Sequence, residues 1–150
     1  MPQSFTCLHY HLLFSTKNRL PAITPELQTR LYEYMGGILR SEKSALLAAG
    51  GITDHVHLLC ALSKELAVAD ALRLIKANSS KWIHETFPEH QSFAWQAGYG
   101  AFAVSYSHLD SVKRYIARQA EHHRRTTFQE EFLMFLRKHR IEFDERHLWD

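Results

Sequence analysis

Two apolar runs separated by one short turn constrain the fold most strongly. Residues 44–52 and 55–62 consist mainly of Ala, Leu, Ile and Val, and only Thr53 and Asp54 lie between them. Strands joined by about two residues pair as an antiparallel hairpin. The sequence therefore predicts an antiparallel sheet with this hairpin inside it.

The segments on both sides of the hairpin alternate between strand and helix patterns. Thr24 is a predicted N-cap, and Pro25 at the first helical position lacks only an N–H that would be unbonded anyway. Strands are expected at 5–16 and 100–106, and helices at 25–42 and 66–86. The order β-α-β-β-α-β predicts an α+β ferredoxin-like sandwich with two helices on one face of the sheet.

Two more helices are expected after the fourth strand. Ser107–Asp110 has a capping-box pattern that opens a helix over 108–125, and Thr127 opens another that runs to about Lys138. We expect residues 1–150 to form one domain, with its core over about 5–125 and a C-terminal helical tail over 126–150. The helix at 108–125 carries Tyr115.

Composition excludes several classes of protein. The 150 residues are 45% hydrophobic and 23% charged, which is typical of a folded globular domain rather than a disordered chain. The sequence contains no run of 18 apolar residues, so no membrane span is expected. The first residues lack the layout of a signal peptide. Cys7 and Cys60 lie in apolar runs, so we expect a cytoplasmic protein without disulfides.

Charge is unevenly distributed although the net charge is only +2. Residues 113–125 hold five basic residues and one acidic residue, whereas residues 129–150 hold four basic and six acidic residues. A basic helix followed by an acidic, solvated tail is typical of a phosphate-binding surface. A merely solvated helix face explains the same charges equally well.

Histidine is unusually frequent, and two histidines alternate on the third predicted strand. Side chains two residues apart on a strand share a face, so His55 and His57 lie side by side while Val56 faces the opposite layer. Two such imidazoles can share one metal ion, with oxygen donors and substrate phosphates completing the shell of Mg²⁺ or Mn²⁺. His9 and His11 repeat the spacing, so the pair alone is equally typical of structural histidines.

The predicted helix at 108–125 carries a second candidate group. Tyr115 and Gln119 are four residues apart and share a helix face, which continues to His122 and His123. The Gln119 carbonyl oxygen suits a hard cation. Lys113, Arg114 and Arg118 surround the tyrosine, which favours a phosphate neighbour over a core position. Packing of Tyr115 on the sheet is the alternative.

Together these segments resemble the single-tyrosine HUH transposases of small bacterial insertion sequences, the IS200-like family. D-H-V-H-L-L at 54–59 corresponds to the HUH element, and V-K-R-Y-I-A-R-Q at 112–119 corresponds to the family's Tyr-x-x-x-Gln element. Further similar segments are the first strand with its basic turn at 9–19, a K-A-N-S-S-K stretch at 76–81, Trp95 and residues 101–105. In that stretch Ala77 and Lys81 replace the family's glycine and arginine.

The resemblance implies a transposase that cleaves and rejoins single-stranded DNA. His55, His57 and Gln119 would hold the Mg²⁺ or Mn²⁺ that orients the scissile phosphate. Tyr115 would attack phosphorus to give a 5′-phosphotyrosine and a free 3′-hydroxyl, without a nucleotide cofactor. DNA contacts are expected at Lys17, Arg19, Lys76, Lys81, Lys113, Arg114 and Arg118.

The resemblance also implies its partners: DNA hairpins at the ends of a mobile element, and a homodimer whose tyrosine helix acts in trans on the partner's histidine pair. Three alternatives remain open. The chain could be a domesticated, non-mobile relative that nicks host repeat DNA, a non-catalytic nucleic-acid-binding ferredoxin-like module, or a small metal-dependent hydrolase in which Tyr115 only packs. Strand 55–62 presents His55, His57 and Leu59 rather than stacking aromatics, which argues against the binding module.

Overall fold

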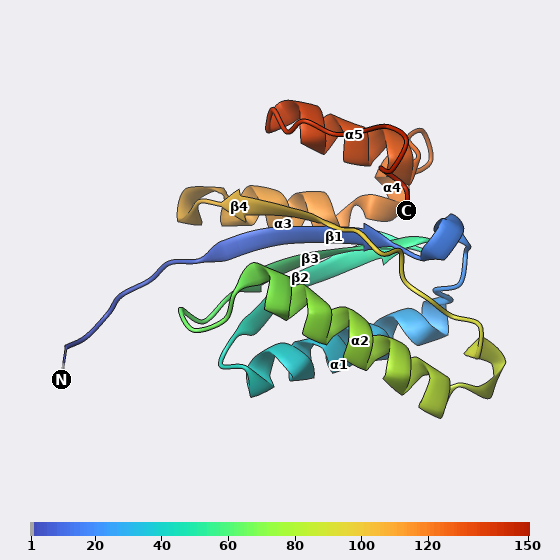
Figure 1. The fold of residues 1–150 in the computed structure, drawn as a ribbon, viewed down its shortest axis with the longest axis horizontal. Coiled ribbons are helices and arrows are strands. Elements are labelled where there is room, and N and C mark those ends of the chain that lie inside the picture. Colours follow the sequence, from blue (N-terminus) through green and yellow to red (C-terminus); the bar gives the residue numbers. More distant parts are fainter. Residues whose placement is uncertain (1) are drawn as a thin grey trace.

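The computed structural model describes residues 2–150 and has the predicted order of strands and helices (Figure 1). The elements are β1 (His9–Ser15), α1 (Pro25–Ser41), β2 (Ala45–Ile52), β3 (His55–Ala61), α2 (Val68–Thr86), β4 (Gly100–Val104), α3 (Leu109–Ala117), α4 (Gln119–His122) and α5 (Phe128–Lys138). Short 3₁₀ turns follow β1, α2 and β4. The predicted α+β class and the ferredoxin-like order are confirmed.

The four strands form one antiparallel sheet in the order β2-β3-β1-β4. The predicted hairpin is the β2–β3 pair, in which Gly50 lies opposite His57. On its other side β3 pairs with β1, which places Leu13 opposite His57. The histidine pair therefore lies on an inner strand, where hydrogen bonds on both sides hold its backbone in place.

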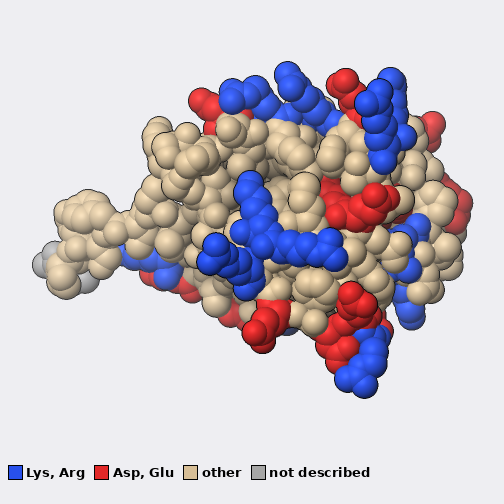
Figure 2. Space-filling view, turned by 90° about the horizontal axis from the view of Figure 1, so that it is seen from above, with Lys and Arg blue, Asp and Glu red and all other residues tan. Residues whose placement is uncertain are grey.

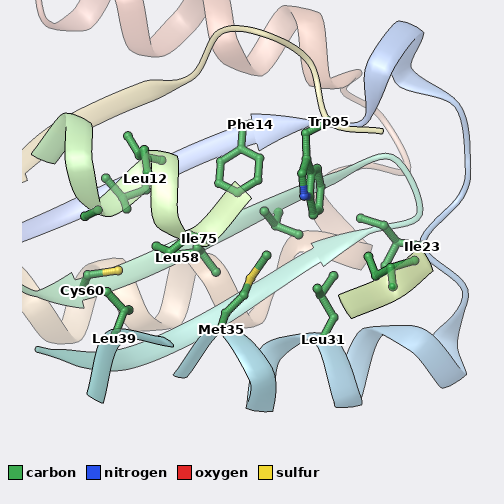
Figure 3. Packing of buried hydrophobic residues seen from close by; sticks show 14 of the residues in the cluster. Leu12, Phe14, Ile23, Leu31, Met35, Leu39, Leu58, Cys60, Ile75 and Trp95 are labelled. Carbon is green, nitrogen blue, oxygen red and sulfur yellow. The ribbon is translucent and has the colours of Figure 1, made fainter. Parts of the chain in front are cut away.

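Helices cover both faces of the sheet. In Figure 1, α1 and α2 lie below the sheet, and α3, α4 and α5 lie above it. The larger core fills the space between the sheet and the lower helices; Leu12, Phe14 and Leu58 meet Met35 and Ile75 there (Figure 3). Alternate residues of β1 and β3 point to the upper face, where the candidate site lies.

Local sequence signals set the starts of two helices. The Thr24 hydroxyl accepts a hydrogen bond from the Leu27 N–H at 3.2 Å, and Pro25 occupies the first turn of α1, as predicted. Thr127 opens α5 with a capping box, in which its hydroxyl accepts from the Glu130 N–H at 3.1 Å. These caps fix where each helix begins, and thereby which residues face the sheet.

Four local expectations were wrong. β1 begins at His9 rather than Phe5, and Phe5 is 88% exposed beyond the sheet. The helix expected at 108–125 is interrupted at Arg118, whose φ and ψ of −102° and 18° leave the helical region, so α4 restarts at Gln119. Ser107 makes no helix cap, and the tail is helical only in α5.

Within residues 2–150, no helix is both long enough and apolar enough to cross a membrane.

Candidate functional site

His55 and His57 lie on the upper face of β3, and both side chains are fully buried. Their ring centroids are 5.1 Å apart, whereas Val56 and Leu58 belong to the core on the opposite face. The alternation of a strand thus places both imidazoles in one layer, as predicted.

Glu131 of α5 lies at the centre of this layer and is fully buried. Its Oε1 atom is 2.8 Å from His57 Nε2, 3.1 Å from His123 Nε2 and 3.6 Å from His55 Nε2. The ligand atoms of these four residues all lie within 4.8 Å of one another, so the cluster could hold a divalent metal ion. We call His55, His57, His123 and Glu131 the histidine–glutamate cluster.

The outer nitrogen of each histidine in the cluster has its own partner. His55 Nδ1 lies 2.8 Å from Asp54 Oδ1, and His123 Nδ1 lies 2.5 Å from the Thr126 carbonyl oxygen. His57 Nδ1 lies 2.7 Å from Nε2 of His11, which β1 brings to the same face. These contacts fix the orientation of all three rings.

The cluster keeps its carboxylate charged and one of its imidazoles neutral. Burial alone would raise the pKa of Glu131, but hydrogen bonds with His123 and His57 outweigh burial and hold that pKa far below its ordinary value. Burial lowers the pKa of His57 to about 4 and that of His11 to about 3. At neutral pH the centre therefore contains an anionic oxygen beside a neutral His57.

Tyr115 of α3 borders the cluster within the same chain. Its hydroxyl donates a hydrogen bond to Glu131 Oε2 and lies 3.4 Å from His122 Nε2. Burial, followed by the hydrogen bond to Glu131, raises the pKa of Tyr115 above its ordinary value, so the phenol is protonated at neutral pH. The predicted nucleophile and the predicted histidine pair lie next to each other.

Gln119 follows the break at Arg118, and its side chain is buried against the cluster. Its Oε1 lies 3.1 Å from His55 Nε2, and its amide nitrogen donates to the Tyr115 carbonyl oxygen at 3.4 Å. The structure therefore brings together all four residues expected to carry the chemistry: His55, His57, Tyr115 and Gln119.

Two hollows meet at Tyr115. One, of about 460 Å³, is lined by Arg114, Arg118 and His122 beside the tyrosine. The other, of about 520 Å³, lies between β4, α3 and α5 and includes Phe102 and Phe135. Figure 2 views this side of the molecule from above and shows Lys and Arg side chains in several groups, with Asp and Glu side chains between them. Tyr115 is thus reached from a basic side and from an aromatic side.

The other predicted DNA contacts do not line either of these two hollows. Lys113 is exposed on α3, Lys17 is exposed in the turn after β1, and Lys81 is exposed on α2 near Glu85. The Arg19 guanidinium lies 5.7 Å from the centre of the Trp149 ring.

Lys76 has a structural contact of its own. Its Nζ donates to the carbonyl oxygens of Ala97 and Gly98 at 3.1 and 3.0 Å, and burial lowers its pKa to about 8. On the same helix the Ser79 hydroxyl accepts from Trp95 Nε1 at 3.0 Å. Residues 76–81 of α2 thus hold the loop before β4 against this helix by hydrogen bonds.

Sequence reasoning missed Glu131, because it treated the acidic C-terminal segment as solvated. A signal was nevertheless present. Phe128, Phe132 and Phe135 recur at helical spacing, and Glu131 lies on the same side of α5 as this apolar stripe. A single carboxylate on such a stripe indicates a buried, partnered charge. His11 and His123 were noticed as histidines without a role, and the structure places both at the cluster.

Comparison with known proteins identifies the family. The family model described as "Transposase IS200 like" matches residues 4–119. The ISDra2 transposase TnpA of Deinococcus radiodurans is 23% identical over 117 residues, which cover 75% of this chain and 84% of the relative.

Two solved structures share the fold. A protein of Deinococcus radiodurans R1 with a provisional assignment as a transposase has a TM-score of 0.65 at 24% identity, covering 79% of this chain and 98% of the other. A REP-associated tyrosine transposase, solved bound to a REP hairpin, has a TM-score of 0.61 at 14% identity, covering 82% of this chain and 73% of the other. Since the family model spans most of the sequence, the chain belongs to the IS200-like transposase family.

Proposed function

We propose that this transposase cleaves and rejoins single-stranded DNA through a covalent intermediate on Tyr115. The observation that carries the proposal is the position of Tyr115. Its hydroxyl touches the histidine–glutamate cluster, and the residue also lines the hollow that contains Arg114 and Arg118. A phosphate in that hollow would meet two guanidinium groups beside the tyrosine.

The proposed reaction is a transesterification. The Tyr115 oxygen attacks phosphorus, the bond from phosphorus to the 3′-oxygen breaks, and the products are a 5′-phosphotyrosine and a 3′-hydroxyl strand. Attack by another 3′-hydroxyl reverses the step and joins a new strand. Each step exchanges one phosphodiester for another, so no nucleotide cofactor is needed.

Tyr115 has to lose its proton when it attacks, because its pKa is raised. Glu131 Oε2 accepts the hydrogen bond from that hydroxyl and is therefore the group in direct contact with the proton that has to leave. The departing 3′-oxygen takes up a proton in the same step. Arg114 and Arg118 would hold the phosphate and stabilise the charge that develops on it.

The donor set of the site fits a divalent metal ion, held by His55, His57 and Gln119 as the resemblance implies. The fit rests on buried imidazole nitrogens and an amide oxygen that face one another at 3.1 Å, as between His55 and Gln119. Such an ion would supply Lewis-acid polarisation of the scissile phosphate. Mg²⁺ and Mn²⁺ are the expected cofactors.

Hairpin recognition is the proposed basis for choosing the DNA. The fold-related transposase was solved with a REP hairpin, which makes hairpins the first substrates to test for this chain. Lys17, Arg19, Lys76 and Lys81 are proposed backbone contacts. They would act with Lys113, Arg114 and Arg118 on α3 and its C-terminal end. The same structural similarity supports one alternative, a non-mobile relative that uses the same nicking chemistry on host repeat DNA.

A homodimer with the tyrosine helix acting in trans stays a prediction. Within the single chain, Tyr115 already contacts Glu131 beside that chain's own histidines, which is a cis arrangement. Mixing a His57→Ala subunit with a Tyr115→Phe subunit separates the two cases. Recovered cleavage by exchanged subunits supports trans action, and an inactive mixture supports cis action.

Denaturing gels test the proposed function. Labelled single-stranded DNA containing a hairpin is incubated with the protein and Mn²⁺, Mg²⁺ or a chelator. We expect a protein–DNA adduct with metal, none with chelator, and none with His57→Ala although that variant still binds the hairpin. Cleavage by water without an adduct would instead support the metal-dependent hydrolase, and binding without cleavage under any condition would support the non-catalytic module.

A further inference from the structure

We propose that His123 and Glu131 complete a four-ligand metal centre with His55 and His57, and that this centre selects a transition-metal ion over Mg²⁺. The inference rests on the proposed function in one respect: both place the metal ion at His55 and His57. The family model matches residues 4–119, so His123 and Glu131 lie outside the matched residues.

The hydrogen positions on two histidines lead to this inference. His55 Nδ1 faces a carboxylate oxygen of Asp54, and His123 Nδ1 faces the carbonyl oxygen of Thr126. Both oxygens can only accept at neutral pH, so each Nδ1 must carry the hydrogen. The Nε2 atom of each neutral ring is then a bare lone pair.

Those lone pairs point at other acceptors. Nε2 of His55 faces Gln119 Oε1 at 3.1 Å and Glu131 Oε1 at 3.6 Å, and Nε2 of His123 faces Glu131 Oε1 at 3.1 Å. Acceptors packed directly against acceptors are unfavourable unless a cation lies among them. The cation is either a metal ion or an extra proton on each ring. With the extra proton, the Nε2–H groups of His55 and His123 donate to Gln119 and Glu131, and metal titration separates the two cases.

His57 fits the same arrangement through a different partner. Its Nδ1 lies 2.7 Å from His11 Nε2 and can donate a hydrogen bond to it. His57 Nε2 then also points its lone pair at the centre. A carboxylate, a carbonyl and an imidazole thus support the three rings from behind, as outer partners do for histidines that bind metals.

The spacing of the inner atoms agrees with one shared ion. Ligands about 2.0–2.1 Å from a tetrahedral ion lie roughly 3.4 Å from one another. The three distances from Glu131 Oε1 to the Nε2 atoms are 2.8, 3.1 and 3.6 Å, which bracket that value. The ligand atoms of all four residues lie within 4.8 Å of one another, so side-chain movements toward the centre would bring them onto one ion.

The donor chemistry sets the preference among ions. Mg²⁺ favours octahedral oxygen ligands and keeps several waters, whereas His55, His57 and Glu131 are fully buried and two of them offer nitrogen. Three imidazoles and one carboxylate suit Zn²⁺, Co²⁺ or Mn²⁺. Gln119 Oε1 borders the centre and is expected to contribute less than Glu131.

Metal titration of the chelator-treated full-length chain, without DNA, tests the inference. We expect one Zn²⁺ or Co²⁺ per chain by calorimetry, the intense visible absorption of tetrahedral Co²⁺, and Mg²⁺ binding weaker by about 100-fold or more. Glu131→Gln and His123→Asn should each weaken Zn²⁺ binding by at least about 100-fold, beyond the roughly 10–100-fold effect of outer partners. The matched control is Glu130→Gln, the exposed neighbour on α5.

Equal affinity for Zn²⁺ and Mg²⁺ in the wild-type chain, or no binding of either, overturns the inference; the latter would assign the extra cations to protons. Wild-type affinity in His123→Asn overturns it as well, even where Glu131→Gln fails to fold by circular dichroism. Tight Zn²⁺ binding without any DNA adduct contradicts the proposed function alone. An adduct formed by a chain that prefers Mg²⁺ contradicts this inference alone.

Discussion

A methyl group added at Gly50 should displace the tyrosine helix. Gly50 lies on β2 opposite His57, where α3 packs directly on the sheet. A Cβ atom there would overlap the Ile116 carbonyl oxygen and lie 2.9 Å from the Ile116 Cγ2 atom. The carbonyl belongs to the helix backbone, so α3 itself must retreat, and Tyr115 is the adjacent residue.

The size of the effect follows from this overlap. Overpacking of a buried contact costs about 1–3 kcal/mol. For a chain of this length each kcal/mol lowers Tm by roughly 2–4 °C, so Gly50→Ala should lower Tm by roughly 2–12 °C. A displacement of Tyr115 by about 1 Å should slow adduct formation by roughly 100-fold.

Gly98→Ala is the matched control, because a Cβ atom at Gly98 would meet nothing closer than 3.9 Å. Thermal unfolding followed by circular dichroism and the rate of adduct formation on denaturing gels are measured for both variants. Should Gly50→Ala match Gly98→Ala in Tm and in rate, the close packing of α3 on β2 would not be what positions the tyrosine.

Two further predictions use other parts of the chain. Burial raises the pKa of the Cys60 thiol to about 12, so iodoacetamide should modify only the exposed Cys7 in the folded protein; mass spectrometry that finds both cysteines modified at equal rates contradicts this packing. Arg114→Ala and Arg118→Ala should each reduce the slope of log affinity for single-stranded DNA against log salt by about 0.7. The control variant is Lys43→Ala, at an exposed residue near Glu65, and it should leave the slope unchanged. If the two arginine variants also leave the slope unchanged, Arg114 and Arg118 do not contact the DNA.

The parts of the fold that were predictable are those set by local pattern. The turn at Thr53 and Asp54 joins β2 to β3, and the cap at Thr24 starts α1, because neighbouring residues alone decide these features. Alternation along β3 likewise places His55 and His57 in one layer. The family resemblance identified Tyr115 and Gln119, which the structure places beside that pair.

The parts that were not predictable depend on long-range packing. No Gly or Pro in the sequence predicts the helix interruption at Arg118. This interruption nevertheless turns the Gln119 side chain toward His55. α5 folds back over the upper face of the sheet, and only this placement brings Glu131 to the cluster. The negative charge of Glu131 predicted a solvent-exposed side chain, whereas the packing of the neighbouring phenylalanines on α5 buries it.

The identity of the covalently modified residue tests the central claim most directly. After reaction with hairpin-containing single-stranded DNA, the adduct is digested with protease and nuclease, and tandem mass spectrometry locates the remaining nucleotide. We predict a 5′-phosphate ester on Tyr115, and no adduct in Tyr115→Phe, which loses one oxygen atom and its hydrogen bond to Glu131 but should still fold. Tyr106 and Tyr99 are the more accessible competitors at 74% and 40% exposure. A nucleotide on either of them, or an adduct that persists in a folded Tyr115→Phe, would contradict the account.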